Sequence, residues 1–209
     1  NASSDSTETE VEKLCEELNL DHLVFIKNDS NEGSAGGFYK ASGACYKSGA
    51  EWIWLMDDDA IPEPDALEAL ITSKAATSPT TGGLGCHVVG ENGSTWLANL
   101  QCTVDRKTFT FAPISIPTKS SDPVASDTNS FDGFLIHRRA IDKLGLPKKE
   151  LFLWWDDLQF SLRISNEFRL WVVPNSRIVH KGKPQNTERR HPWLNVALET
   201  YDWADTWKM

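Results

Sequence analysis

In Trp52-Ile-Trp-Leu-Met-Asp-Asp-Asp59, five apolar residues run directly into three carboxylates, and this segment is the strongest indication of the fold class. The apolar run has the length of a buried strand, and open α/β sheets bind ligands beyond the carboxyl ends of their strands. Three adjacent carboxylates repel one another and need a compensating cation. Mg²⁺ or Mn²⁺ suits this role, because hard divalent ions prefer carboxylate oxygens. A solvated acidic turn that caps the helix opened by Pro62 is the alternative.

Other elements alternate around this strand. Further strands are expected at residues 23–26, 84–89, 131–137, 170–173 and 177–180. Helices are expected after a Thr7 cap and at residues 38–47, 65–74, 139–144 and 156–166. A β-hairpin or extended segments should occupy 94–117, and a polar, mobile loop 120–129. Alternating strands and helices predict an α/β fold with a mixed, mostly parallel sheet flanked by helices.

The composition excludes several classes of protein. With 40% hydrophobic and 24% charged residues among 209, the chain is typical of a globular domain rather than a disordered one. Its net charge of −9 argues against a nucleic-acid partner, which needs clustered cations. No apolar run of transmembrane length and no apolar leader is visible. The four cysteines form no C-x-x-C pair, so we expect a reducing cytoplasm rather than a disulfide framework.

Two further motifs offer binding or catalytic groups. In the loop Asn31-Glu-Gly-Ser-Ala-Gly-Gly37, glycines permit close backbone approach and a following helix would favour anions, although a mere tight loop is the alternative. In Phe152-Leu-Trp-Trp-Asp-Asp157, one aspartate can cap a helix while the other works as a base. The two tryptophans there suit either a sugar platform or core packing.

One histidine has a context of its own. His180 ends a predicted strand just before Lys181 and Gly182. If the fold brings it near Asp59, an imidazole and a carboxylate together would complete a metal site. Most lone histidines are structural, so this placement decides between the two interpretations.

Taken in order, these motifs resemble the inverting GT-A glycosyltransferases of glycosyltransferase family 2, above all the rhamnosyltransferase and galactofuranosyltransferase branches. The resemblance rests on Asn1-Ala-Ser-Ser-Asp-Ser-Thr7, Asn31-x-Gly-x-Ala-Gly-Gly37, Trp54-Leu-Met-Asp-Asp-Asp59-Ala-Ile-Pro62, Trp154-Trp-Asp-Asp157 with Arg163, Val173-Pro174 and Ile178-Val-His180. It implies a GT-A, Rossmann-like catalytic domain over residues 1–182, followed by a basic and then Trp-rich C-terminal extension over 183–209.

The resemblance also implies an activity. A sugar would pass from a nucleotide-diphosphate donor, UDP- or dTDP-linked, to a hydroxyl of a glycan or lipid-linked acceptor in cell-wall or surface polysaccharide synthesis. The implied metal ligands for Mn²⁺ or Mg²⁺ are Asp57, Asp59 and His180. The implied general base is Asp157, with Asp156 beside it. The implied donor-binding residues are Asn31, Gly33, Gly36, Gly37, Asp57 and Asp58. The implied sugar-stacking residues are Trp154 and Trp155.

The sequence departs from this family at both ends. Relatives begin with a nucleotide-gripping strand and loop, so about 30–40 residues are expected to be absent, leaving the nucleotide pocket incomplete. The tail lacks the pattern that many relatives share. Its basic segment 181–190 suits either anionic lipid at the inner face of a membrane or, as we favour, a solvated loop.

Two other functions stay open. A nucleotide-sugar pyrophosphorylase would need a phosphate loop with Arg or Lys, and residues 31–37 contain neither. A non-catalytic or degenerate carbohydrate-binding module would use the acidic and Trp-rich surface to bind sugar without turnover.

Overall fold

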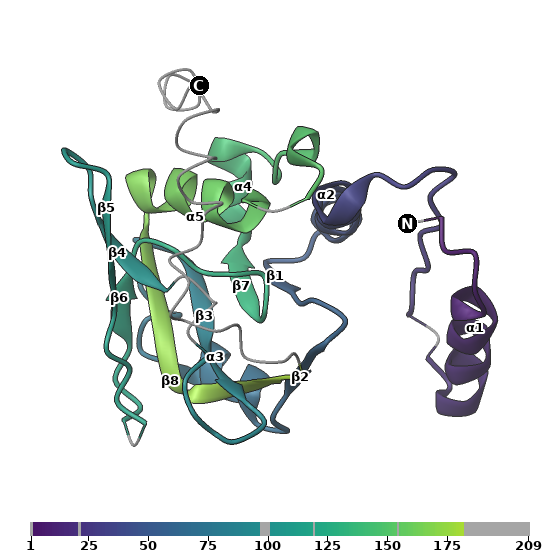
Figure 1. The fold of residues 1–209 in the computed structure, drawn as a ribbon, viewed down its shortest axis with the longest axis horizontal. Coiled ribbons are helices and arrows are strands. Elements are labelled where there is room, and N and C mark those ends of the chain that lie inside the picture. Colours follow the sequence, from purple (N-terminus) through teal and green to yellow (C-terminus); the bar gives the residue numbers. More distant parts are fainter. Residues whose placement is uncertain (1, 21, 97–100, 119, 154, 182–209) are drawn as a thin grey trace.

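A central sheet organises the molecule (Figure 1). The computed structural model describes residues 2–20, 22–96, 101–118, 120–153 and 155–181. The sheet has the order β1-β7-β3-β8-β2, and β6 pairs with β8. Its strands are β1 (Trp52–Leu55), β2 (Ala60–Pro62), β3 (Thr81–Gly90), β6 (Val124–Ser126), β7 (Phe134–His137) and β8 (Arg169–His180). The hairpin of β4 (Cys102–Asp105) and β5 (Thr110–Pro113) forms a second, two-stranded sheet, as the sequence predicts.

The strand directions differ from the expectation. An α/β sheet is confirmed, but among the described strands only β3 and β8 pair in parallel, so "mostly parallel" is wrong. The other pairings, β1–β7, β3–β7, β2–β8 and β6–β8, are antiparallel. The reason is that β7 inserts between β1 and β3 and runs against both. An apolar run shows that a strand is buried, but it does not encode which neighbour the strand meets.

Helices cover both faces of the sheet. The described helices are α1 (Thr7–Leu18), α2 (Gly33–Lys47), α3 (Ala66–Thr72), α4 (Arg138–Leu144), the 3₁₀ turn η1 (Lys149–Leu151) and α5 (Asp156–Glu167), of which α1 does not lie on the sheet. Figure 1 shows α2, α4 and α5 on one side and α3 on the other. Side chains alternate along a strand, so Ile53 and Leu55 pack in the core beneath α4 and α5, while Trp52 and Trp54 pack in the core that contains Leu70 of α3.

Several expected boundaries differ in the structure. The sequence predicts two strands around Pro174, but β8 is continuous, because a register irregularity opposite Cys86 and His87 accommodates residues 174–176. Within the predicted polar loop 120–129, β6 pairs with the first half of β8. Helix α2 begins at Gly33 rather than at residue 38.

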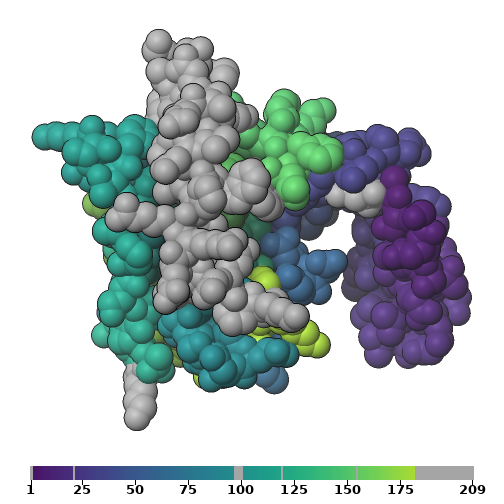
Figure 2. Space-filling view, in the orientation of Figure 1, coloured from purple at the N-terminus to yellow at the C-terminus, as the bar shows by residue number. Residues whose placement is uncertain are grey.

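The N-terminal segment stands apart from this body. Figures 1 and 2 show α1 beyond an open gap, joined to the rest through α2. The predicted strand 23–26 is wrong: these residues have no strand structure and their side chains are exposed, Val24 by 74%. No described strand lies beside them to satisfy a strand's backbone hydrogen bonds. The Thr7 cap is also wrong, because Ser6 is the N-cap, and the Asp5 carboxylate accepts the hydrogen bond from the Thr7 N–H at 3.1 Å.

Candidate functional site

The three carboxylates after β1 form a turn that leads into β2. Asp57 is half-buried, while Asp58 and Asp59 are exposed. Strand β2 pairs with the end of β8 so that Ala60 lies opposite His180, and the Lys181 N–H donates to the Asp59 carbonyl at 3.0 Å. The Nε2 atom of His180 consequently lies 3.5 Å from Oδ2 of Asp59. The two residues meet as the metal-site hypothesis requires.

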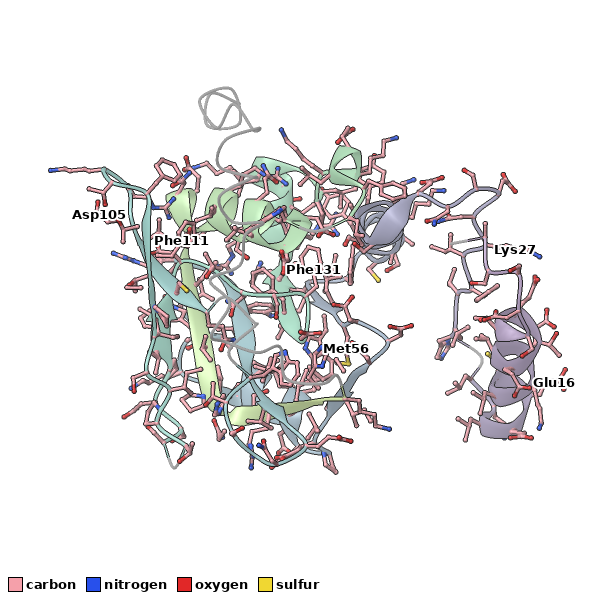
Figure 3. All side chains as sticks on the ribbon, in the orientation of Figure 1. Glu16, Lys27, Met56, Asp105, Phe111 and Phe131 are labelled. Carbon is pink, nitrogen blue, oxygen red and sulfur yellow. The ribbon has the colours of Figure 1, made fainter. Side chains whose placement is uncertain are left out.

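A third carboxylate joins them from the start of β7. Single ligand atoms of Asp59, Asp132 and His180 all lie within 4.8 Å of one another, so the three side chains could hold a metal ion together. Asp132 is buried, with 6% of its surface exposed. Its neighbour Gly133 has a φ of +85° and donates its N–H to the Leu55 carbonyl at 3.0 Å, which holds Asp132 beside the end of β1. In Figure 3, Met56 and Phe131, which precede Asp57 and Asp132, are labelled in the central part of the molecule.

Asp132 is not among the ligands that the sequence motifs predict. Its only sequence signal is an aspartate before a glycine and an apolar strand, a pattern that does not tell which strand end it will meet. Asp57, which the family resemblance implies as a metal ligand, lies outside the group of three. Its assignment as a metal ligand therefore stays a prediction.

Asp57 instead links the group of three to a second pair of carboxylates. Burial raises the pKa of Asp57 to about 7, and the negative charges of Asp132, Asp59 and Asp157 add to the rise. A hydrogen bond between Asp57 and Asp132 favours the protonated form in the same direction. A cation at this point would relieve the repulsion among these carboxylates.

The second pair opens α5. Trp155, with a φ of +65°, is the N-cap residue, so Asp156 does not cap the helix; both aspartates lie in its first turn. Burial, together with the charge of Asp156, raises the pKa of Asp157 to about 7. Burial likewise raises the pKa of Asp156. Oδ1 of Asp157 accepts the Leu158 N–H at 2.6 Å, which fixes its orientation. A carboxylate with a pKa near neutrality is suited to accept a proton.

Of the two tryptophans predicted to stack on a sugar, the structure describes only Trp155. Trp154 lies outside the described residues. Trp155 is half-buried and packs against a small core of Val104, Leu158 and Leu162, which joins the β4–β5 hairpin to α5. This is the core-packing alternative that the sequence left open, and stacking of Trp155 on a sugar stays a prediction.

The glycine loop packs against the segment that leads to α5. Gly33 has a φ of +70°, and a Cβ there would lie 1.9 Å from the Phe152 carbonyl oxygen. Oδ1 of Asn31 accepts the Gly33 N–H at 2.9 Å. A Cβ at Gly36 would lie 2.4 Å from Cβ of Glu32. These contacts give two of the glycines a packing role, and contact with a donor by Asn31, Gly33, Gly36, Gly37 and Asp58 stays a prediction.

None of the helices described here is both long and apolar enough to cross a membrane.

Comparison with known proteins points to one family. Residues 2–196 match the family described as "Glycosyltransferase like family 2". A galactofuranosyltransferase of Mycolicibacterium smegmatis, GlfT1, is 23% identical over 181 residues, which cover 69% of this chain and 55% of that protein. The chain thus spans about half the length of this curated relative.

Solved glycosyltransferase structures share the fold. GalNAc-T7, solved with UDP, GalNAc and Mn²⁺, superposes with a TM-score of 0.59 at 17% identity, covering 86% of this chain and 36% of that one. The mannosyltransferase PcManGT of Pyrobaculum calidifontis, solved with GDP-Man and Mn²⁺, gives 0.58 at 16% identity, covering 92% and 48%. Residues 1–349 of TarS from S. aureus give 0.58 at 18% identity, covering 86% and 49%.

Proposed function

The chain belongs to glycosyltransferase-like family 2, and we propose that it transfers a sugar from a nucleotide-diphosphate donor to an acceptor hydroxyl with inversion at the anomeric carbon. The observation that carries this proposal is the convergence of Asp59, Asp132 and His180, whose ligand atoms lie within 4.8 Å of one another. Asp57 and Asp157 lie close enough to this group for their charges to interact.

The donor atoms of this group suit a divalent cation. Two carboxylates and one imidazole offer hard oxygen ligands and a borderline nitrogen, a set compatible with Mn²⁺ or Mg²⁺. A bound ion would offset the charge that develops on the leaving diphosphate. The related structures with UDP or GDP-Man and Mn²⁺ support this assignment. In a chain with a net charge of −9, an anionic donor also requires such neutralisation.

The base is Asp157. Its raised pKa of about 7 lets it accept a proton near neutral pH. The acceptor oxygen forms a bond to the anomeric carbon, the bond from that carbon to the diphosphate oxygen breaks, and the acceptor's proton passes to Asp157. One displacement from the opposite face inverts the anomeric configuration. Buried Asp156, beside the base, keeps the local potential negative and so raises the basicity of Asp157.

For the donor and acceptor we favour the galactofuranosyltransferase-like branch. The branch is supported by the GlfT1 match, and a UDP-linked donor is supported by two structural neighbours solved with UDP, GalNAc-T7 and TarS. On this basis a UDP-linked sugar is the first donor to test, ahead of a dTDP-linked one, and the acceptor is a glycan or lipid-linked glycan.

Donor turnover tests the proposal. The protein is incubated with UDP-, dTDP- and GDP-sugars and Mn²⁺, and release of the nucleoside diphosphate is followed with water or short galactosides as acceptor. We expect turnover of one donor class, loss of turnover in Asp157→Asn, and a product anomer opposite to the donor's by proton NMR. The matched control, Asp65→Asn, changes an exposed carboxylate outside the site. A retained anomeric configuration, or full turnover by Asp157→Asn, would contradict the mechanism.

A further inference from the structure

One aromatic side chain lies flat against the imidazole of His180. The ring centroids of Trp96 and His180 are 4.6 Å apart and their planes differ by 11°, which is a stacked arrangement. Trp96 is 9% exposed and belongs to the same apolar core as Ile178, two residues before His180. We propose that Trp96 is a positioning residue that holds the His180 imidazole in the orientation needed for a metal ion; this inference rests on the metal site of the proposed function.

Backbone hydrogen bonds hold the main chain at Trp96 against β3. The chain turns back after β3, and Trp96 donates its N–H to the Val88 carbonyl at 2.9 Å. Gly90 donates to Ser94 at 2.9 Å, closing the turn. Thr95, which precedes Trp96, also contacts β3, because its Oγ1 lies 3.0 Å from Nε2 of His87. β3 therefore fixes the main chain of Trp96, and the apolar core packs its indole.

The glycine at the end of β3 leaves room for the indole of Trp96. Gly90 pairs with His180 across β3 and β8. A Cβ at Gly90 would lie 3.3 Å from the indole Cε3 of Trp96, closer than an ordinary contact. The absent side chain thus lets the indole come close to the histidine of the adjacent strand.

Stacking on Trp96 restricts rotation of the His180 ring, which would move Nε2 out of position to bind a metal ion. Rotation about Cβ–Cγ of His180 would swing Nε2 away from Oδ2 of Asp59, which lies 3.5 Å from it. A flat neighbour opposes this rotation, so less conformational entropy is lost when a cation binds. Groups that orient a metal-binding histidine commonly change metal affinity by about 10–100-fold through hydrogen bonds. For a stacking contact we expect a smaller effect, about three- to tenfold.

Direct titration of Mn²⁺ into the protein, followed by electron paramagnetic resonance of the free ion, tests this role. Trp96→Leu should weaken Mn²⁺ binding about three- to tenfold, and Trp96→Phe, which keeps a flat ring, should weaken it less. Trp52→Leu is the matched control. Trp52 also contacts a histidine, His137, at a centroid distance of 4.5 Å, but His137 is not part of the group of three that could hold the metal ion. It should bind Mn²⁺ as the unaltered protein does.

A double-variant cycle separates positioning from general destabilisation. If Trp96 acts through His180, Trp96→Leu should have no further effect on Mn²⁺ affinity once His180→Ala is present. An equal loss in both backgrounds, or unchanged affinity in Trp96→Leu alone, would overturn the inference. Should Trp96→Leu fail to fold by circular dichroism, Trp96→Met takes its place, because the flexible methionine side chain adapts to the space left by the indole and has no flat face. If the unaltered protein binds no Mn²⁺, the metal site of the proposed function fails, and this inference with it.

Discussion

Replacing the proposed base should stabilise the protein at alkaline pH. Burial raises the pKa of Asp157 from its ordinary 3.8 to about 7, so the folded state favours the protonated carboxyl. The stability contributed by this group is full below about pH 4 and is lost as the pH rises through about 7. The shift corresponds to about 4 kcal/mol at about 1.36 kcal/mol per pKa unit. Because the side chain is partly exposed, solvent screens the charge, and we expect about half of this, ~2 kcal/mol, at about pH 8.

Urea unfolding of Asp157→Asn and the unaltered protein, followed by circular dichroism at about pH 4 and pH 8, measures this effect. Asparagine keeps the Oδ1 that accepts the Leu158 N–H, so the helix start is preserved. The variant should gain ~2 kcal/mol at the higher pH and little at the lower one. Asp65→Asn, an exposed carboxylate, should change neither value. Equal or lower stability of Asp157→Asn at about pH 8 would refute the claim that this carboxylate is strained by burial.

Three further outcomes follow from the same geometry. Because the base must be ionised, kcat/KM for donor turnover should rise with pH and level off above about pH 7, which is the raised pKa of Asp157. A kcat/KM that is flat from about pH 5 to 8 would exclude Asp157 as the base. Asp132→Asn should weaken Mn²⁺ binding by about tenfold or more in a calorimetric titration, and unchanged affinity would remove Asp132 from the metal site. Gly33→Ala should lower the free energy of unfolding in urea by about 2 kcal/mol more than Gly49→Ala does. Both glycines have a positive φ, but of the two only Gly33 lacks space for a Cβ. Equal losses would contradict the close packing of Gly33 against Phe152.

The sequence predicts best where local patterns and burial agree. An apolar run that ends in carboxylates identified β1 and the acidic turn, because a short buried strand must be apolar and its end is exposed to ligands. The helix over Asp156–Glu167 followed from apolar spacing in the same way. The sequence makes a metal site conditional on the meeting of Asp59 with His180, and the pairing of β2 with β8 fulfils this condition.

Contacts set by strand order could not be predicted from the sequence. Asp132 reaches the site because β7 inserts between β1 and β3, and no local pattern encodes this insertion. Trp96 reaches His180 through a turn after β3 and the pairing of β3 with β8. For residues 23–26 the sequence predicts a strand that the structure does not contain. The side chains have the composition of a buried strand, but a strand also requires a partner, and none of the described strands provides one.

The most direct test of the central claim is calorimetric titration of UDP, dTDP and GDP into the folded protein, each with and without Mn²⁺. The account predicts that one nucleotide binds only when Mn²⁺ is present, and that His180→Ala abolishes this dependence. Binding of a nucleotide that is equally tight without Mn²⁺ and unaffected by His180→Ala, or no binding of any nucleotide to the folded protein, would contradict it.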